Sequence, residues 1–265
     1  MAMALNGPRY AAIVTVLTLT AVVRTVGAQQ PAPREAIERA KAAVVAVGTF
    51  QRTRTPQFRF AGTGFAVADG TLIATNAHVI PPVIGGGAEP ETLVALLPAR
   101  DTGSSRVVEL ERVATDAQHD LALLRLKGVR LPALTLREAD NAAEGDALLF
   151  TGFPIGAVLG PFAATHRAMI AAITPIALPP PRADKLDARV VRQLQSGAFA
   201  VYQLDGAAYP GNSGSPLYDA ASGDVIGIVN MVFVKGLKEN ALSQPSGISY
   251  AIPVRHLRVL LMTAR

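Results

Sequence analysis

The side chains best suited to chemistry in this sequence are a glycine-flanked serine, four histidines and a few aspartates. The sequence contains no cysteine, which excludes a disulfide bond, a zinc–thiolate site and a thiol nucleophile. A covalent mechanism would therefore use a serine, threonine, lysine or carboxylate as its nucleophile.

Ser213 is the most informative candidate nucleophile, because it lies in the segment YPGNSGSP at residues 209–216. Glycines on both sides of a serine allow a tight turn that exposes the hydroxyl. They also leave backbone N–H groups free to stabilise an oxyanion, where each donor is worth about 10²–10³ in rate. Taken alone, the segment is more typical of a plain turn between two strands.

A serine hydroxyl needs a base to act at neutral pH, and histidine is the usual one. His78 follows an expected strand in the segment TNAHV, and the small alanine before it would let a substrate approach. By itself, His78 is more typical of a buried structural histidine. The other three histidines fit the role less well: His119 precedes a strand, His166 has no helpful context, and His256 lies between two arginines of the closing helix and is expected to be solvated.

The base needs a carboxylate to orient it. Asp120 stands at the start of an apolar run, where a carboxylate would be held rigidly, although an aspartate there also fits a strand cap. Asp116 is the competing candidate, in the loop before it. Asp120 follows His78 by 42 residues and Ser213 follows Asp120 by 93, so the first two lie in one half of the chain and the serine in the other.

The elements that must position these residues are short β-strands separated by Gly, Pro and Asp. Six are expected in each half, which predicts two packed antiparallel barrels. A short helix is expected at residues 31–43 and a closing helix at Val254–Thr263. The expected strands are Val44–Phe50, Phe58–Val67, Thr71–Thr75, Leu93–Leu97, Arg106–Val113, Asp120–Leu126, Ala147–Phe153, Ala168–Ile173, Ala198–Leu204, Pro216–Tyr218, Val225–Phe233 and Ile248–Ile252.

Three further segments are expected outside these strands. Asp69-Gly70 predicts a hairpin turn, residues 81–91 a surface loop, and residues 128–145 a linker between the two halves. Residues 174–197 look like an insertion, because their triple proline forces an extended chain.

The N-terminal residues predict an export signal. Arg9 precedes a mainly apolar run that is 13 residues long, Ala11 to Val23, and is too short for a membrane span of about 20 residues. Cleavage is expected after Ala28. The expected divisions are a signal peptide at 1–28, a helical segment at 29–43, one barrel at 44–135 and a second barrel with its closing helix at 136–265. An exported chain without cysteine suits a bacterial envelope, periplasmic or secreted, with no stable membrane span after cleavage.

The composition narrows the function classes. Hydrophobic residues make up 50% of the chain and charged residues 17%, which excludes a disordered protein. The formal net charge is +5, so a basic nucleic-acid binder with a steep salt dependence is a minor hypothesis. Lysine and arginine are scattered and aromatic residues are only 5% of the chain, so no nucleic-acid partner is expected.

Several segments together resemble the trypsin-like serine proteases, and most closely the HtrA type (the high-temperature-requirement proteases of the bacterial envelope). The similarity covers about residues 36–262 in colinear order. The segments that carry it are Gly62–Phe65, Thr75–Val79, Asp120–Leu124, Gly152–Gly156, Pro210–Gly214, Val225–Ile228 and Gly247–Pro253.

This resemblance implies an all-β fold of two six-stranded barrels and a serine endopeptidase that needs no metal and no cofactor. His78 would be the general base, Asp120 its orienter and Ser213 the nucleophile, with the N–H groups of Gly211 and Ser213 as the oxyanion hole. The partners would be protein or peptide substrates, and relatives often form trimers through their N-terminal segments. The substrate pocket would be formed by Ala207, Asn230, Val232 and Ile248, which predicts cleavage after small aliphatic residues.

The sequence departs from the family at several positions. Ser215 replaces a usual glycine, where a hydroxyl would crowd the turn, and the segment after Gly156 is altered near His166. Digestive relatives carry an aspartate just before the nucleophile, whereas Asn212 is neutral here, so activation by an ion pair with a new N-terminus is not expected. The usual PDZ domain is missing from this sequence, so no peptide capture by such a module is expected. A catalytically weak binding or chaperone-like module is the alternative function.

Overall fold

The structure is a computed structural model of the chain, and it describes residues 33–81, 90–97, 105–156, 160, 162–176, 199–230 and 247–264. Several predictions lie outside the described residues: the signal peptide at 1–28, most of the loop at 81–91, the insertion beyond residue 176, and the pocket residue Val232.

The first barrel confirms the predicted six strands in the first half of the chain. Its closed order is β1-β2-β3-β6-β5-β4, and every neighbouring pair is antiparallel. Most of its buried side chains are Ala, Val, Ile and Leu, and the β-branched ones among them suit a pleated, buried surface. The strands are β1 (Val44–Phe50), β2 (Phe58–Val67), β3 (Leu72–Asn76), β4 (Thr92–Leu97), β5 (Arg106–Asp116) and β6 (Leu121–Leu126).

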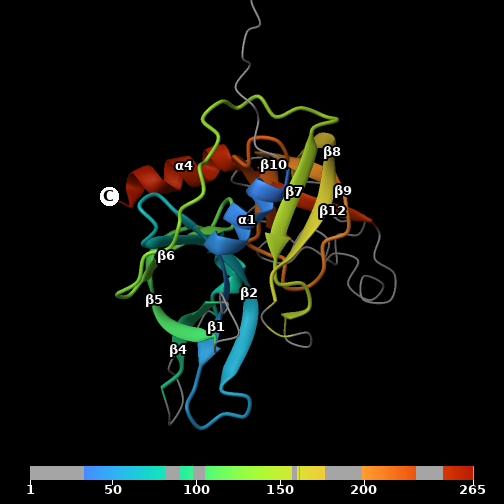
Figure 1. Cartoon of the computed structure of the whole chain (residues 1–265). Helices are drawn as coiled ribbons and strands as arrows, with labels where there is room; N and C mark the ends of the chain where they lie inside the picture. Colours follow the sequence, from blue (N-terminus) through green and yellow to red (C-terminus); the bar gives the residue numbers. More distant parts are fainter. Residues whose placement is uncertain are drawn as a thin grey trace, which may run out of the picture.

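The second barrel is also closed and antiparallel, in the order β10-β11-β12-β9-β8-β7. Figure 1 shows its strands grouped beside the first barrel. The strands are β7 (Ala147–Gly152), β8 (Ala164–Ile176), β9 (Phe199–Asp205), β10 (Pro216–Asp219), β11 (Val225–Asn230) and β12 (Ile248–Pro253).

In the described part of the chain, two α-helices lie outside the barrels (Figure 1), as predicted. Helix α1 (Pro33–Ala43) buries three alanines at positions 36, 40 and 43, a helical spacing that puts them on one face. Helix α4 (Val254–Thr263) buries Val254, Leu257 and Leu260 in the same way and packs against β6 and β11, so it contacts both barrels. A short 3₁₀-helix, η1 (Ala77–Val79), follows β3.

Some boundaries differ from the prediction. β8 extends beyond the predicted Ala168–Ile173 at both ends, because it pairs with β7 through its first half and with β9 through its second. β5 likewise runs on to Asp116, past a bulge between Arg112 and Ala114. The predicted linker at residues 128–145 is partly fixed to the second barrel, since Leu136 forms a parallel β-bridge with Val225.

A continuous apolar core holds the two barrels together. One buried cluster runs from the first barrel to Leu149, Phe153 and Tyr218 of the second barrel and Leu257 of α4. Complete burial of one such side chain stabilises the fold by about 1.5–3 kcal/mol. The barrels therefore dock through buried surface, which is what fixes groups of one barrel against groups of the other.

Candidate active site

His78 and Asp120 are brought together by two neighbouring strands. β3 and β6 pair with Asn76 opposite Leu121, so η1, which follows β3, lies beside the turn that precedes β6. The imidazole Nδ1 of His78 is 2.6 Å from Oδ2 of Asp120, and the His78 backbone N–H donates to Oδ1 at 2.9 Å. The carboxylate thus holds both the ring and the backbone of the histidine, with Nε2 on the far side of the ring.

Asp120 itself is held by contacts from several directions. Its φ of +53° is in the left-handed region, which costs energy for a non-glycine residue. Its carbonyl oxygen accepts hydrogen bonds from the Ala77 N–H at 3.0 Å and the Asn76 side-chain amide at 3.1 Å. The Asn230 amide, which comes from β11 of the other barrel, donates to Oδ2 at 2.8 Å. These bonds offset the strain and fix the carboxylate relative to both barrels.

The competing carboxylate, Asp116, contacts a different histidine. Its Oδ2 is 2.6 Å from Nδ1 of His119, and its Oδ1 accepts the His119 backbone N–H at 3.0 Å. The ring of His119 stacks on His256, with centroids 3.8 Å apart, and Phe199 packs edge-on against both rings. The two acid–histidine pairs have the same local geometry, but only the Asp120 pair contacts the second barrel's Asn230.

The prediction that His256 is solvated is wrong. Its Nε2 atom is buried and has no hydrogen-bond partner within the described part of the chain. Burial, together with the charges of His119 and Arg255, lowers its pKa from 6.5 to about 4. The helical pattern alone did not reveal this burial, because it arises from the stack on His119.

His166 lies away from the carboxylates, in β8, where it pairs with Phe150 of β7 and stacks on that ring at 5.0 Å. Burial lowers the pKa of His166. These contacts give it a structural role in the second barrel.

Ser213 belongs to the second barrel and contacts the first barrel close to the turn that carries His78. Its carbonyl oxygen accepts the Thr63 N–H at 2.9 Å, and the next residue's N–H donates to Val229, beside Asn230. A Cβ atom on Gly62 would meet Val79 at 2.7 Å and the Ser213 carbonyl at 3.0 Å, so the turns bearing the histidine and the serine lie on two sides of this glycine. No hydrogen bond between the described residues joins the serine hydroxyl to the imidazole, and such bonds often tighten only when substrate binds.

The backbone N–H groups of Gly211 and Ser213 are oriented by hydrogen bonds to the carbonyl oxygens of their own peptide groups, which belong to Pro210 and Asn212. The Pro210 carbonyl accepts the Ile155 N–H at 2.7 Å, and the Asn212 carbonyl accepts the Ser215 N–H at 3.0 Å. Because C=O and N–H point in opposite directions across a trans peptide, the N–H groups of Gly211 and Ser213 point away from those partners. Neither N–H donates to any backbone carbonyl in the described residues.

Gly211 requires the conformational freedom of glycine. Its φ is +105°, the left-handed value that the third position of a type II turn needs. The Asn212 N–H closes that turn on the Tyr209 carbonyl at 2.9 Å. A Cβ atom at Gly211 would lie 2.3 Å from the Phe153 carbonyl oxygen and 2.8 Å from the Phe60 ring. The turn that aims the Gly211 N–H is thus incompatible with a side chain at this position.

The departure of Ser215 from the family pattern predicts a crowded turn, but its hydroxyl does not crowd the turn. Its hydroxyl fills the space above Gly152, where a Cβ atom would lie 2.0 Å from Oγ. That oxygen is buried and without a hydrogen-bond partner in the described chain, as are both side-chain polar atoms of Asn212. The absence of a side chain at Gly152 is what accommodates the serine.

The predicted pocket residues are only partly gathered. Ala207 is half-buried, Ile248 is exposed at the start of β12, and Asn230 is buried against Asp120. Ser249 was missed: its hydroxyl donates to the Gly206 carbonyl at 2.5 Å and accepts the Ala208 N–H at 2.9 Å, on both sides of Ala207. Ser249 lies in the family-like segment Gly247–Pro253, but the segment does not reveal its hydrogen bonds, because the partners are more than 40 residues away.

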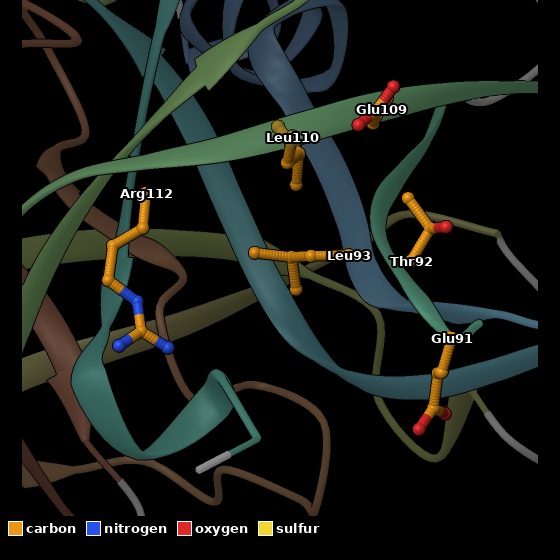
Figure 2. Close-up of a pocket in the computed structure, with 6 residues that line it drawn as sticks. All are labelled: Glu91, Thr92, Leu93, Glu109, Leu110 and Arg112. Carbon is orange, nitrogen blue, oxygen red and sulfur yellow. The ribbon is translucent and has the colours of Figure 1, made fainter. Parts of the chain in front are cut away.

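A separate pocket lies on β4 and β5 of the first barrel and contains no residue of the Asp120 or Ser213 region (Figure 2). Within the described residues, no group of three or more His, Asp or Glu side chains is arranged to hold a metal ion. The residues that line the pocket are Glu91, Thr92, Leu93, Glu109, Leu110 and Arg112.

Comparison with known families gives one domain match. Residues 62–228 match the trypsin-like peptidase domain. The matched range begins at Gly62 and includes His78, Asp120 and Ser213.

Two curated relatives illustrate the similarity. The chain is 31% identical over 197 residues to "Probable periplasmic serine endoprotease DegP-like" of Halomonas elongata, covering 74% of this chain and 33% of the relative. It is 30% identical over 201 residues to "Serine protease HTRA2, mitochondrial" of Bos taurus, covering 76% of this chain and 35% of the relative. The chain thus spans about a third of the length of these relatives.

A solved structure has the same fold. The crystal structure of the serine endoprotease from Yersinia pestis matches with a TM-score of 0.58 at 24% identity, covering 88% of this chain and 66% of that one. None of the helices in the described part of the chain has the length and apolar character needed to span a membrane.

Proposed function

Because the chain belongs to the trypsin-like peptidase family, we propose that it is an HtrA-type serine endopeptidase that works through an acyl-enzyme on Ser213. The observation that carries this proposal is the cross-barrel arrangement of Asp120, His78 and the Ser213 turn. The names of the relatives, which are serine proteases, support the same reaction class.

His78 would act as the general base. Asp120 accepts from Nδ1, which leaves Nε2 as the proton acceptor in the neutral ring. As Ser213 Oγ attacks the carbonyl carbon of a peptide bond, its proton passes to Nε2, and the carboxylate stabilises the imidazolium. The imidazolium then gives the proton to the leaving amine as the C–N bond breaks.

The N–H groups of Gly211 and Ser213 would stabilise the oxyanion. Their directions are set by the bonds of Ile155 and Ser215 to the neighbouring carbonyls, so no reorganisation is needed when the charge develops. A water molecule, activated by His78, would then attack the acyl-enzyme and release the second product. This route uses protein groups and one water molecule.

One support for the alternative, a catalytically weak binding module, is the expectation that Ser215 disturbs the turn. The space over Gly152 takes up that hydroxyl, and the turn keeps its hydrogen bonds. This arrangement supports the enzyme over the binding module.

We also propose that the enzyme cleaves after small aliphatic residues and acts outside the cytoplasm. Ala207 carries no charge to pair with lysine or arginine, and the two ends of its segment are tied to Ser249. Export from residues 1–28 would agree with the periplasmic naming of relatives. A trimer stays a prediction.

The substrate proposal is tested with peptides that differ only at the residue before the cut. We expect the highest kcat/KM for Ala and Val, and no hydrolysis by Ser213→Ala. A preference for Arg would contradict the pocket, whereas hydrolysis by Ser213→Ala at the wild-type rate would contradict the nucleophile.

A further inference from the structure

Thr63, on β2 of the first barrel, contacts the loops of the second barrel that carry the proposed oxyanion hole. The residue is completely buried. Its hydroxyl oxygen is 2.7 Å from the Gly211 carbonyl and 3.1 Å from the Phe153 N. Its backbone N–H donates to the Ser213 carbonyl at 2.9 Å. One side chain and one backbone group of the first barrel thus bind three backbone groups of the second, which belong to the Phe153 loop and to the Gly211–Ser213 turn.

The direction of the hydroxyl hydrogen bond is determined by its partners. A backbone N–H can only donate and a carbonyl can only accept. The threonine oxygen therefore accepts from Phe153, and its single proton goes to the Gly211 carbonyl. The hydroxyl joins the Phe153 loop, which orients the Pro210 carbonyl through Ile155, to the turn that carries the hole.

The carbonyls bound by Thr63 alternate along the turn with the proposed oxyanion donors. Thr63 holds the peptide groups after Gly211 and after Ser213, while the donors belong to the peptide groups before these residues. Close packing adds to the constraint, because a Cβ atom on Gly214 would lie 2.0 Å from the Thr63 carbonyl oxygen. That oxygen also accepts the Thr75 hydroxyl at 2.7 Å, so Thr63 is itself held.

We infer that Thr63 is a positioning residue that sets the geometry of the oxyanion hole from the opposite barrel. This inference rests on the proposed serine-protease function. Thr63 touches neither the serine hydroxyl nor the imidazole in the hydrogen-bond network of the described residues. Its effect is on the backbone of Gly211 and Ser213, so its loss should lower transition-state stabilisation more than substrate binding.

The test compares Thr63→Val, which removes the hydroxyl at nearly constant shape, with Thr63→Ser, which keeps it. We expect Thr63→Val to lower kcat by about 10–100-fold, somewhat less than removal of a whole oxyanion donor, with KM nearly unchanged. Thr63→Ser should recover most of the loss. Thr49→Val is the matched control, because Thr49 is a buried β1 threonine whose hydroxyl bonds to Glu91, away from the site. It should lower Tm and leave kcat unchanged.

A second measurement does not depend on activity. Amide hydrogen exchange of the peptide containing residues 209–214 should be faster in Thr63→Val than in wild type, and unchanged in Thr49→Val. Wild-type kcat in Thr63→Val, or slow exchange of that peptide, would overturn the inference. If the wild-type enzyme hydrolyses no substrate, the proposed function fails, and the exchange data still decide whether Thr63 holds the turn.

Discussion

Asp120 shows how one residue combines conformational strain with a proposed chemical role. Its left-handed backbone is held by two bonds to its carbonyl oxygen, and its carboxylate accepts from His78 and Asn230. Strain of this kind persists where surrounding contacts over-determine the conformation. In the sequence, Asp120 differs from Asp116 by its place before an apolar run and by the family-like segment Asp120–Leu124. The hydrogen bonds now assign each aspartate to its own histidine.

The variant Asp120→Asn should remove the negative charge of the side chain without disturbing the fold. Asparagine tolerates the left-handed region, and the carbonyl bonds to Ala77 and Asn76 stay, so Tm should change little. Because the amide cannot hold the correct imidazole tautomer, kcat should fall by about 10⁴-fold.

Asp116→Asn is the matched control for this experiment, since that carboxylate contacts His119 instead of His78. It should keep wild-type kcat. Equal losses in the two variants would contradict the assignment of Asp120 as the orienting carboxylate.

At the scale of elements, the sequence predicted every strand of both barrels and the helices α1 and α4. Runs of residues that favour β-strands were sufficient for β1 and β2, whose predicted and observed limits agree. The pattern failed at β8, where polar His166 and Arg167 concealed the start of a strand that is stabilised by pairing on both edges. Ladder hydrogen bonds between strands distant in sequence are not visible in a local pattern.

Helix α4 and the turn before Asp120 meet at the His256–His119 stack, which predicts a pH dependence of stability. An unfolded histidine titrates near 6.5, whereas the folded-state pKa of His256 is about 4, lowered by burial and by His119 and Arg255 and opposed by Asp116 and Asp140. Between these values the unfolded state binds the extra proton, so stability falls as the pH drops from about 6.5 towards 4.

The variant His256→Phe keeps an aromatic ring in the stack but cannot titrate. Its free energy of unfolding should decline less between pH 7 and pH 5 than that of wild type, as measured by urea denaturation. His166 contributes equally to both proteins, because burial lowers its pKa in each. Identical declines in the two proteins would show that His256 is not buried in its neutral form.

At the scale of the whole molecule, the site exists only because two barrels dock. The hydrogen bond between Thr63 and Gly211 joins residues 148 positions apart, and that between Asn230 and Asp120 joins residues 110 apart. Motifs predicted His78, Asp120 and Ser213, since each stands in a recognisable segment. Thr63, Ser249 and the role of Asn230 depend on contacts between distant segments, which no single segment encodes.

The central claim is that Ser213 is a nucleophile activated by His78, and covalent labelling with a fluorophosphonate tests it most directly. Peptide mapping by mass spectrometry should find the adduct on Ser213 of the wild-type protein. Labelling should disappear in Ser213→Ala, fall strongly in His78→Ala, and persist in His256→Phe. A folded wild-type protein that takes up no label, or an adduct that survives Ser213→Ala, would contradict the account.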